Sequence, residues 1–297
     1  MRTNYNQMRD TERFLRRKII VLIALVLLAT VSIVWLIVGR YQPVDICFPP
    51  IYGSACLFLD EMETDAEGFP LNFLLISKNC GGLSDFLMEA ANNDISFHNE
   101  KIIASISNFE KDQSAGNYTL LSLTVRLRLK EAKPGEQIRL EQMTLGGREF
   151  DFGELTLYLY ATREHPPELS VSSESVATTG AGLAPYQAGF LTGSDSFFIT
   201  DITVIGYEDI MPTLSFQEEH IPFIGTAVEI PPNVKLNLQI DFSWNTTPDA
   251  EVYYAAPNIK IQSKAGREST VRFNCFTCGL FLSETEILNL GNRMFQE

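Results

Sequence analysis

The chain has 297 residues, of which 45% are hydrophobic and 20% are charged, and 37 Asp and Glu outnumber 23 Lys and Arg for a formal net charge of −14. Its 20 Phe and 10 Tyr exclude a globally disordered chain, which would be poor in aromatic residues. The acidity argues against a nucleic-acid partner, because a negative surface repels phosphates.

A basic stretch and an apolar segment open the chain. Residues 1–18 carry six basic side chains, and 19–38 contain no charged residue. A helix of this length spans roughly 30 Å, the thickness of the hydrocarbon layer. The run is too long for the apolar region of a cleaved signal peptide, and no A-x-A-like cleavage site follows it. Residues 19–39 are therefore predicted to be a transmembrane signal anchor, in which the Thr30 and Ser32 hydroxyls can bond back to the preceding turn.

The charges on either side of this segment indicate its orientation. Residues 16–18 are all basic, whereas no Lys or Arg occurs between Arg40 and Lys78. By the positive-inside rule, 1–18 is expected to be a cytoplasmic basic tail and 41–297 to be extracytoplasmic. We therefore predict a single-pass type II protein of the cell membrane or of a secretory-pathway membrane.

Alternation of apolar and polar residues dominates the chain after residue 100. Apolar residues take every second position through most of 119–129, and the same period recurs in 155–159 and 234–242, with shorter runs at 259–261 and 271–273. In a strand these residues share one face, and one buried and one wet face is typical of antiparallel sheets. The sequence therefore predicts a mainly β fold, an antiparallel β-sandwich-type ectodomain.

Turns and helices complete the expected pattern. Glycine-containing turns are predicted at 133–136, 146–147 and 264–267, between the strands. Only two short helices are expected. One covers 84–92, and the other is a C-terminal helix that follows a capping box at 283–286.

A stretch rich in Ser, Thr, Gly, Ala and Pro interrupts the β regions at 164–196. It is too long for an ordinary loop in a compact domain, so it is either an inter-domain linker or a long loop. The β-rich regions on its two sides, 41–163 and 197–297, are each near the size of a small sandwich. Two small sandwiches packed together are slightly favoured over one large sandwich.

Every cysteine lies in the part of the chain expected outside the cytoplasm, where disulfides persist. The candidates for disulfide bonds are Cys47, Cys56, Cys80, Cys275 and Cys278. Because their number is odd, at least one thiol is free or pairs with another chain. The C-x-x-C formed by Cys275 and Cys278 has neither a thioredoxin-like βαβ context nor a second pair of zinc ligands, so a structural role is favoured over a redox or zinc site.

Two glycosylation sequons and one acidic run remain. Asn117 and Asn245 each begin an N-x-T sequon, which a eukaryotic secretory pathway would glycosylate. The acidic run at 60–67 lacks the glycine and the closing glutamate of a calcium-binding loop, so it is interpreted as a solvated acidic loop.

No catalytic motif is recognisable. The sequence contains no nucleophile elbow, P-loop or dinucleotide-binding fingerprint, and His98, His165 and His220 are not arranged as a metal-binding motif. We therefore predict no catalytic residue, no cofactor and no metal ion.

The favoured function is a non-catalytic binding or scaffolding module for a protein or glycan partner, held at the membrane by one span. An accessory subunit of a membrane complex is the first alternative. A membrane-tethered hydrolase of envelope or extracellular polymers is the second, because carboxylate pairs are not recognisable as such in so acidic a chain.

Overall fold

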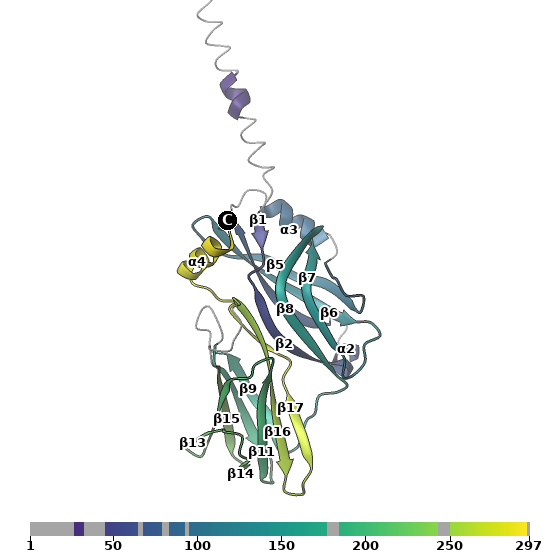
Figure 1. Cartoon of the computed structure of the whole chain (residues 1–297), viewed down its shortest axis with the longest axis vertical. Helices are drawn as coiled ribbons and strands as arrows, with labels where there is room; N and C mark the ends of the chain where they lie inside the picture. The colour runs from purple at the N-terminus through teal and green to yellow at the C-terminus, as the bar shows by residue number, and fades with distance from the viewer. Residues whose placement is uncertain are drawn as a thin grey trace, which may run out of the picture.

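The computed structural model describes residues 27–32, 45–64, 68–78, 83–92, 95–176, 184–242 and 250–295. Within these residues the chain is mainly β, with three sheets and short helices that include one near the C-terminus. Figure 1 shows two lobes, which we call the upper lobe and the lower lobe after their places in the view.

The strands, in chain order, are β1 (Asp45–Cys47), β2 (Ile51–Phe58), β3 (Phe69–Lys78), β4 (Ser96–Phe97), β5 (Ile102–Ala115), β6 (Tyr118–Leu129), β7 (Gln137–Leu145), β8 (Arg148–Tyr160), β9 (Leu169–Val176), β10 (Tyr186–Thr192), β11 (Phe197–Ile205), β12 (Ile210–Phe216), β13 (Glu219–Pro222), β14 (Val228–Ile230), β15 (Lys235–Phe242), β16 (Val252–Ser263), β17 (Glu268–Arg272) and β18 (Phe276–Cys278). The helices are α2 (Leu59–Thr64), α3 (Leu83–Asn92) and α4 (Glu284–Met294). Strands β1–β8 with these helices make up the upper lobe (Figure 1). Strands β9–β15, β17 and β18 make up the lower lobe, and β16 belongs to both.

The described strands form sheets of four, five and nine strands. The four-stranded sheet has the order β1-β3-β6-β5, and the five-stranded sheet has the order β13-β12-β15-β10-β9. The nine-stranded sheet follows the path β14-β11-β16-β2-β8-β7-β4, with β17 and β18 also paired to β16. This last sheet runs through both lobes and is the layer that connects them (Figure 1).

Each alternating run predicted from the sequence lies in a strand. The runs fall in β6, β8, β15, β16 and β17; the run at 234–242 begins one residue before β15, and the run at 271–273 ends one residue after β17. In β15 the burial alternates as predicted, with Leu236, Leu238 and Ile240 facing the core.

The prediction of purely antiparallel sheets is wrong for β2. This strand pairs in parallel with β8 on one side and with β16 on the other. Nearly all of its residues are buried, so it presents an apolar run instead of an alternating pattern. Burial on both faces is the usual setting of parallel strands, because covering layers lie above and below them.

Two separate cores follow from this layering. In the upper core, the four-stranded sheet packs on β2, β7 and β8. In the lower core, the five-stranded sheet packs on β11, β16 and β17. Strand β16 contributes to both, since Tyr254 lies in the upper core and its neighbour Tyr253 in the lower one.

The structure confirms the C-terminal helix and the capping box predicted from the sequence. Ser283 caps α4 by accepting from the Glu286 backbone N–H, and the Glu286 carboxylate accepts from the Ser283 backbone N–H at 2.7 Å. The buried face of α4 places Ile287 and Leu290 in the upper core. The chain therefore returns to the first lobe after it has built the second.

Two segments differ from the loops expected of them. Strands β9 and β10 lie within 164–196, and both pair in the five-stranded sheet. Ser, Thr and Gly are tolerated there because the outer face of the sheet is solvated. In the acidic run, residues 59–64 form α2, where the Asp60 carboxylate accepts from the Glu61 N–H at 2.8 Å; residues 65–67 lie outside the described residues. The helix predicted at 84–92 is α3, which begins one residue earlier.

The predicted cytoplasmic tail lies outside the described residues, as does the predicted membrane anchor except for 27–32. These six residues are helical and exposed. The Thr30 hydroxyl donates to the Leu27 carbonyl at 2.9 Å and the Ser32 hydroxyl to the Leu28 carbonyl at 2.8 Å, as predicted. No helix among the described residues combines the length and the apolar character needed to span a bilayer.

The close contact of β2 with β16 predicts that alanine substitutions at two glycines differ sharply in their effect on stability. Gly53 has φ +139°, and a Cβ there would overlap the Tyr254 carbonyl of β16. We expect Gly53→Ala to lower the free energy of unfolding by roughly 3 kcal/mol or more, as backbone strain and overlap add. Urea denaturation followed by circular dichroism measures this.

Gly135→Ala is the matched control. Gly135 also has a positive φ, of +85°, but nothing lies within 4 Å of its Cβ position. The control should lose only about 1 kcal/mol. Equal losses in the two variants would show that the contact between β2 and β16 does not constrain Gly53.

Candidate functional site

The outer face of the five-stranded sheet carries a row of polar side chains. Its strands alternate, so that every second residue of β15 and β12 points away from the core. Tyr186 and Phe190 of β10 and Leu238 of β15 are buried beneath this face. The polar side chains therefore stand on a packed layer.

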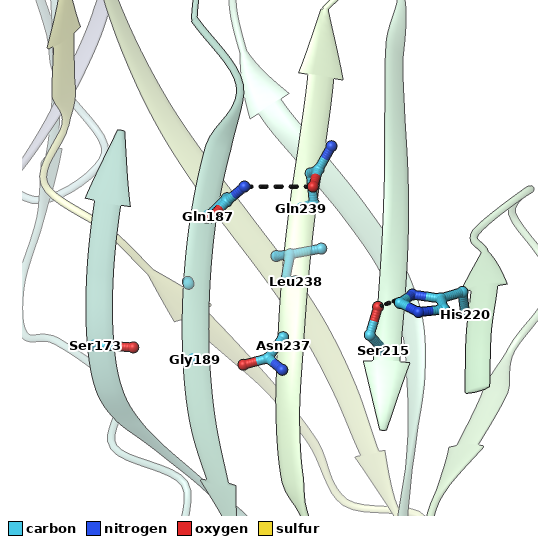
Figure 2. A pocket seen from close by; sticks show the side chains of 9 residues that line it. Ser173, Gln187, Gly189, Ser215, His220, Asn237, Leu238 and Gln239 are labelled. Carbon is cyan, nitrogen blue, oxygen red and sulfur yellow. Dashed lines mark hydrogen bonds between the residues drawn. The ribbon is translucent and has the colours of Figure 1, made fainter. Parts of the chain in front are cut away.

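Five residues lie in register across this face, one on each strand. This cross-strand row consists of Ser173, Gly189, Asn237, Ser215 and His220, on β9, β10, β15, β12 and β13 in that order. Each residue is the direct Cα partner of the next one. Figure 2 shows the polar members of the row aligned across the sheet.

A second pair of polar residues lies beside the row. Gln187 and Gln239 are direct partners on β10 and β15, and the Gln187 amide donates to the Gln239 carbonyl oxygen at 3.4 Å (Figure 2). The Gln239 amide in turn donates to the Asp241 carboxylate, at 3.0 and 3.1 Å. These bonds hold the Gln239 side chain flat along its strand.

Together these residues line an open groove of about 280 Å³, which we call the sheet groove. Gly189, which is buried and has no side chain, is one of its lining residues. A Cβ at this position would lie 2.5 Å from the Ser173 hydroxyl and 3.5 Å from the Asn237 carbonyl oxygen. The two polar groups therefore converge over the space that the glycine leaves open.

The hydrogen bonds within the groove divide its polar groups into two kinds. Ser215 and His220 share a bond of 2.7 Å between the hydroxyl and Nδ1. The Ser173 hydroxyl and the Asn237 amide, by contrast, have no hydrogen-bond partner among the described residues. Both are exposed, so water satisfies them, and both are available to a ligand.

The lining of the groove carries no Lys, Arg, Asp or Glu side chain, and His220 is its one ionisable group. A serine beside a histidine invites comparison with a catalytic pair. In a hydrolytic triad, however, a carboxylate orients the imidazole through its other nitrogen. Among the described residues, the His220 ring bonds to Ser215 alone. The arrangement is suited to hydrogen bonding of a neutral ligand.

The other histidines lie on different elements. His98 approaches Glu149 at 3.9 Å and Thr144 at 3.4 Å in the upper lobe, and His165 is exposed between β8 and β9. In the described ranges, no three His, Cys, Asp or Glu side chains are grouped as a metal site would require. Glu61 of the acidic run pairs with Arg163 at 2.7 Å.

The cysteines are dispersed between the two lobes. Among the described residues, no disulfide joins Cys47, Cys56, Cys275 and Cys278, and Cys80 lies outside the described residues. The disulfides expected from the sequence stay a prediction. The Cys278 sulfur accepts from the Ala184 backbone N–H at 3.4 Å, which ties the end of β18 to the start of β10.

Burial raises the pKa of three of these thiols. It raises the pKa of Cys56 to about 12 and that of Cys278 to about 11. For Cys47, burial and then the Asp45 carboxylate raise the pKa to about 12. Because the thiolate is the nucleophile, a redox function of the C-x-x-C receives no support from this setting.

The two sequons have different outcomes. Asn117 is exposed in the turn between β5 and β6, where its side chain is accessible to modification. Asn245 lies outside the described residues. Glycosylation of either remains a prediction.

Sequence reasoning missed the sheet groove. The polar character of Asn237 and Gln239 was visible within a predicted strand, but such residues are normally solvated. Gly189 and Ser173 lay in the stretch interpreted as linker or loop. The alternation within β10 is a weak signal that could have placed Gln187 and Gly189 on one face.

Comparisons with known proteins add little. No protein-family model and no curated protein matches the chain. Among solved structures, the adhesin CfaE of enterotoxigenic E. coli has a TM-score of 0.27 at 9% identity, covering 82% of this chain and 89% of its own. The Enterococcus faecalis MSCRAMM ACE has a TM-score of 0.22 at 8% identity, covering 80% and 93%. A beta-glycosidase from Bacteroides vulgatus has a TM-score of 0.22 at 9% identity, covering 78% and 24%. TM-scores this low carry no argument about function.

The thiol environment predicts slow alkylation. In the native full-length chain at pH 8, we expect Cys56 and Cys278 to resist iodoacetamide, because both are buried and protonated. In urea without reductant both should be labelled rapidly, as measured by mass spectrometry of peptides. Labelling that needs a reductant as well would instead identify disulfides at these positions.

The same shifts predict the direction of a pH dependence. The ordinary pKa of Cys is 9.0, and folding raises it to about 12 for Cys56 and about 11 for Cys278. Above pH 9 the unfolded chain loses protons that the folded chain retains, so the stabilisation present below pH 9 is lost as pH rises toward 12.

The free energy of unfolding at pH 8, 9, 10 and 11 measures this loss. The double variant Cys56→Ala, Cys278→Ala is the control, since it keeps the Tyr and Lys titrations and should show a shallower fall. Identical slopes for the two proteins would contradict the prediction.

Proposed function

We propose that the chain is a non-catalytic binding module for a protein or glycan partner, held at a membrane by one span with its β lobes on the extracytoplasmic side. We further propose that the sheet groove is its binding surface. The observation that carries the proposal is the cross-strand row, which brings five strands together at one open space.

A polar outer face alone would be an ordinary solvated surface. Gly189 is what distinguishes this one. The backbone there has no positive φ that would require glycine, and glycine in a strand interior weakens the strand. Glycine in a strand often marks a place where another group approaches closely. The pairing of β9 with β10 also shifts register between Gly189 and Phe190, and bulges are frequent beside functional sites.

The scaffold beneath the groove supports this role. Tyr186 stacks on Phe276 with ring centroids 4.9 Å apart, and Phe190 contacts Phe273 edge-on at 6.1 Å. These contacts fix β10 from below, so the groove is formed before any ligand arrives. Binding to a preformed site avoids the entropic cost of ordering loops.

A photo-crosslinking experiment tests the assignment of the binding face. Lys235 is exposed on β15, two residues before Asn237 on the same face. A p-benzoylphenylalanine placed at position 235 of the full-length chain, expressed in its native cells, should form an adduct with the partner. Adding Asn237→Ala should reduce the adduct at least about fivefold, as a lost hydrogen bond costs about 1 kcal/mol.

The control places the same probe at position 289, an exposed asparagine on α4. This probe should give no adduct that responds to Asn237→Ala. Adducts at 235 that are unaffected by Asn237→Ala, or the same adducts at both positions, would overturn the assignment of the groove.

A further inference from the structure

We infer that the sheet groove binds a neutral oligosaccharide. This inference rests on the proposed function, because it names the ligand class of the same groove. It depends on three properties of the described residues: the chemistry of the lining, the position of the groove on the sheet, and the space over Gly189.

The lining offers hydroxyl and amide groups that both donate and accept. Ser173 and Ser215 supply hydroxyls, and Gln187, Asn237 and Gln239 supply side-chain amides. Sugar hydroxyls also donate and accept hydrogen bonds, so each can pair with either the donor or the acceptor of a protein hydroxyl or amide. The aromatic and arginine anchors that dominate the energetics of protein interfaces are missing from this lining.

The position of the groove disfavours an extended peptide. A peptide that adds to a sheet pairs its backbone with a free strand edge. The groove instead lies over β10 and β15, which are interior strands, each paired on both sides. Over these two strands a ligand meets side chains and the backbone of Gly189 but no free strand edge, which suits recognition through hydroxyl groups.

The space over Gly189 suits contact with a sugar hydroxyl. Ser173 and Asn237 stand on strands separated by β10, so their Cα atoms are roughly 10 Å apart, two strand spacings. The Ser173 hydroxyl and the Asn237 carbonyl oxygen converge over Gly189, 2.5 and 3.5 Å from the place of a Cβ, so this space suits a single sugar hydroxyl that contacts both. The groove continues along the row to Ser215, and its volume of about 280 Å³ is near the lower end of small-molecule sites.

Charge favours a neutral sugar over an acidic one. The lining carries no Lys or Arg that could pair with a carboxylate or a sulfate. Just outside the lining, Asp241 accepts from Gln239, and Lys235 stands two residues from Asn237 on the same face. The chain as a whole has a net charge of −14. The net charge of the chain therefore favours neutral sugars over sialylated, sulfated and uronic acid sugars, most strongly at low ionic strength.

An array of neutral and acidic oligosaccharides tests the inference. The full-length chain, displayed in multivalent form, should bind neutral glycans and leave the acidic ones. Asn237→Ala should lower this binding at least about fivefold, because the amide faces the ligand with no competing partner in the protein. Asn289→Ala, the same change at an exposed position of α4, should leave binding unchanged.

Gly189→Ala is the sharper variant, because it fills the space over Gly189 without a large cost to the fold. Its Cβ would lie 2.5 Å from the Ser173 hydroxyl and 3.2 Å from the Ser172 hydroxyl, both of which can rotate away, and its φ lies outside the region that favours glycine. We expect an unchanged thermal midpoint together with at least about a tenfold loss of neutral-glycan binding.

The outcomes separate the inference from the proposed function. One outcome is that the array shows no binding of neutral glycans, while the probe at position 235 still gives adducts sensitive to Asn237→Ala. That result would overturn the glycan inference but keep the proposed binding module, with a protein as its ligand. Preferential binding of acidic glycans would also overturn the inference. If neutral-glycan binding survived both Asn237→Ala and Gly189→Ala, the groove would not be the binding site, which would contradict both this inference and the binding surface named in the proposed function.

Discussion

The hydrogen-bonded pairing of β2 with β16 is the constraint on which the arrangement of the two lobes depends. Strand β16 pairs with β2 at its start and with β11 farther along, so one continuous strand belongs to both lobes. Its alternate side chains enter the two cores, Tyr254 above and Tyr253 below. The lobes are therefore joined by one strand whose side chains alternate between the two cores, and not by a flexible linker.

Hydrogen bonds close to this pairing reinforce it from the lower lobe. The Tyr207 hydroxyl donates to the Tyr254 carbonyl at 3.0 Å, and the Tyr52 hydroxyl donates to the Gly206 carbonyl at 3.0 Å. The Ser54 hydroxyl reaches the Ile205 carbonyl at 2.6 Å. Burial raises the pKa of Tyr207, so its hydroxyl stays protonated and donates across the ordinary pH range. The five-stranded sheet thus rests on a layer that is fixed to the upper lobe.

Local patterns in the sequence predicted individual elements well, and pairings between distant segments poorly. The alternation of 234–242 and the capping box at Ser283 and Glu286 are local, and both were confirmed. The parallel pairing of β2 was not predictable, because a short apolar run is compatible with several buried settings. The groove was even less predictable. Its row joins residues 173 to 237 through four register choices, and a shift of one residue in any strand would turn its polar side chains inward.

The exposed polar lining limits the affinity of a single groove. Exposed groups such as Ser173 and Asn237 are bonded to water before a ligand arrives, so each new hydrogen bond contributes only about 1 kcal/mol net. Without an aromatic anchor in the lining, a few such bonds give weak binding at a single groove. Attachment to a membrane, as proposed for this chain, compensates for this weakness. Many copies on one surface meet a repeating ligand at high effective concentration, and their combined avidity exceeds the affinity of each by orders of magnitude.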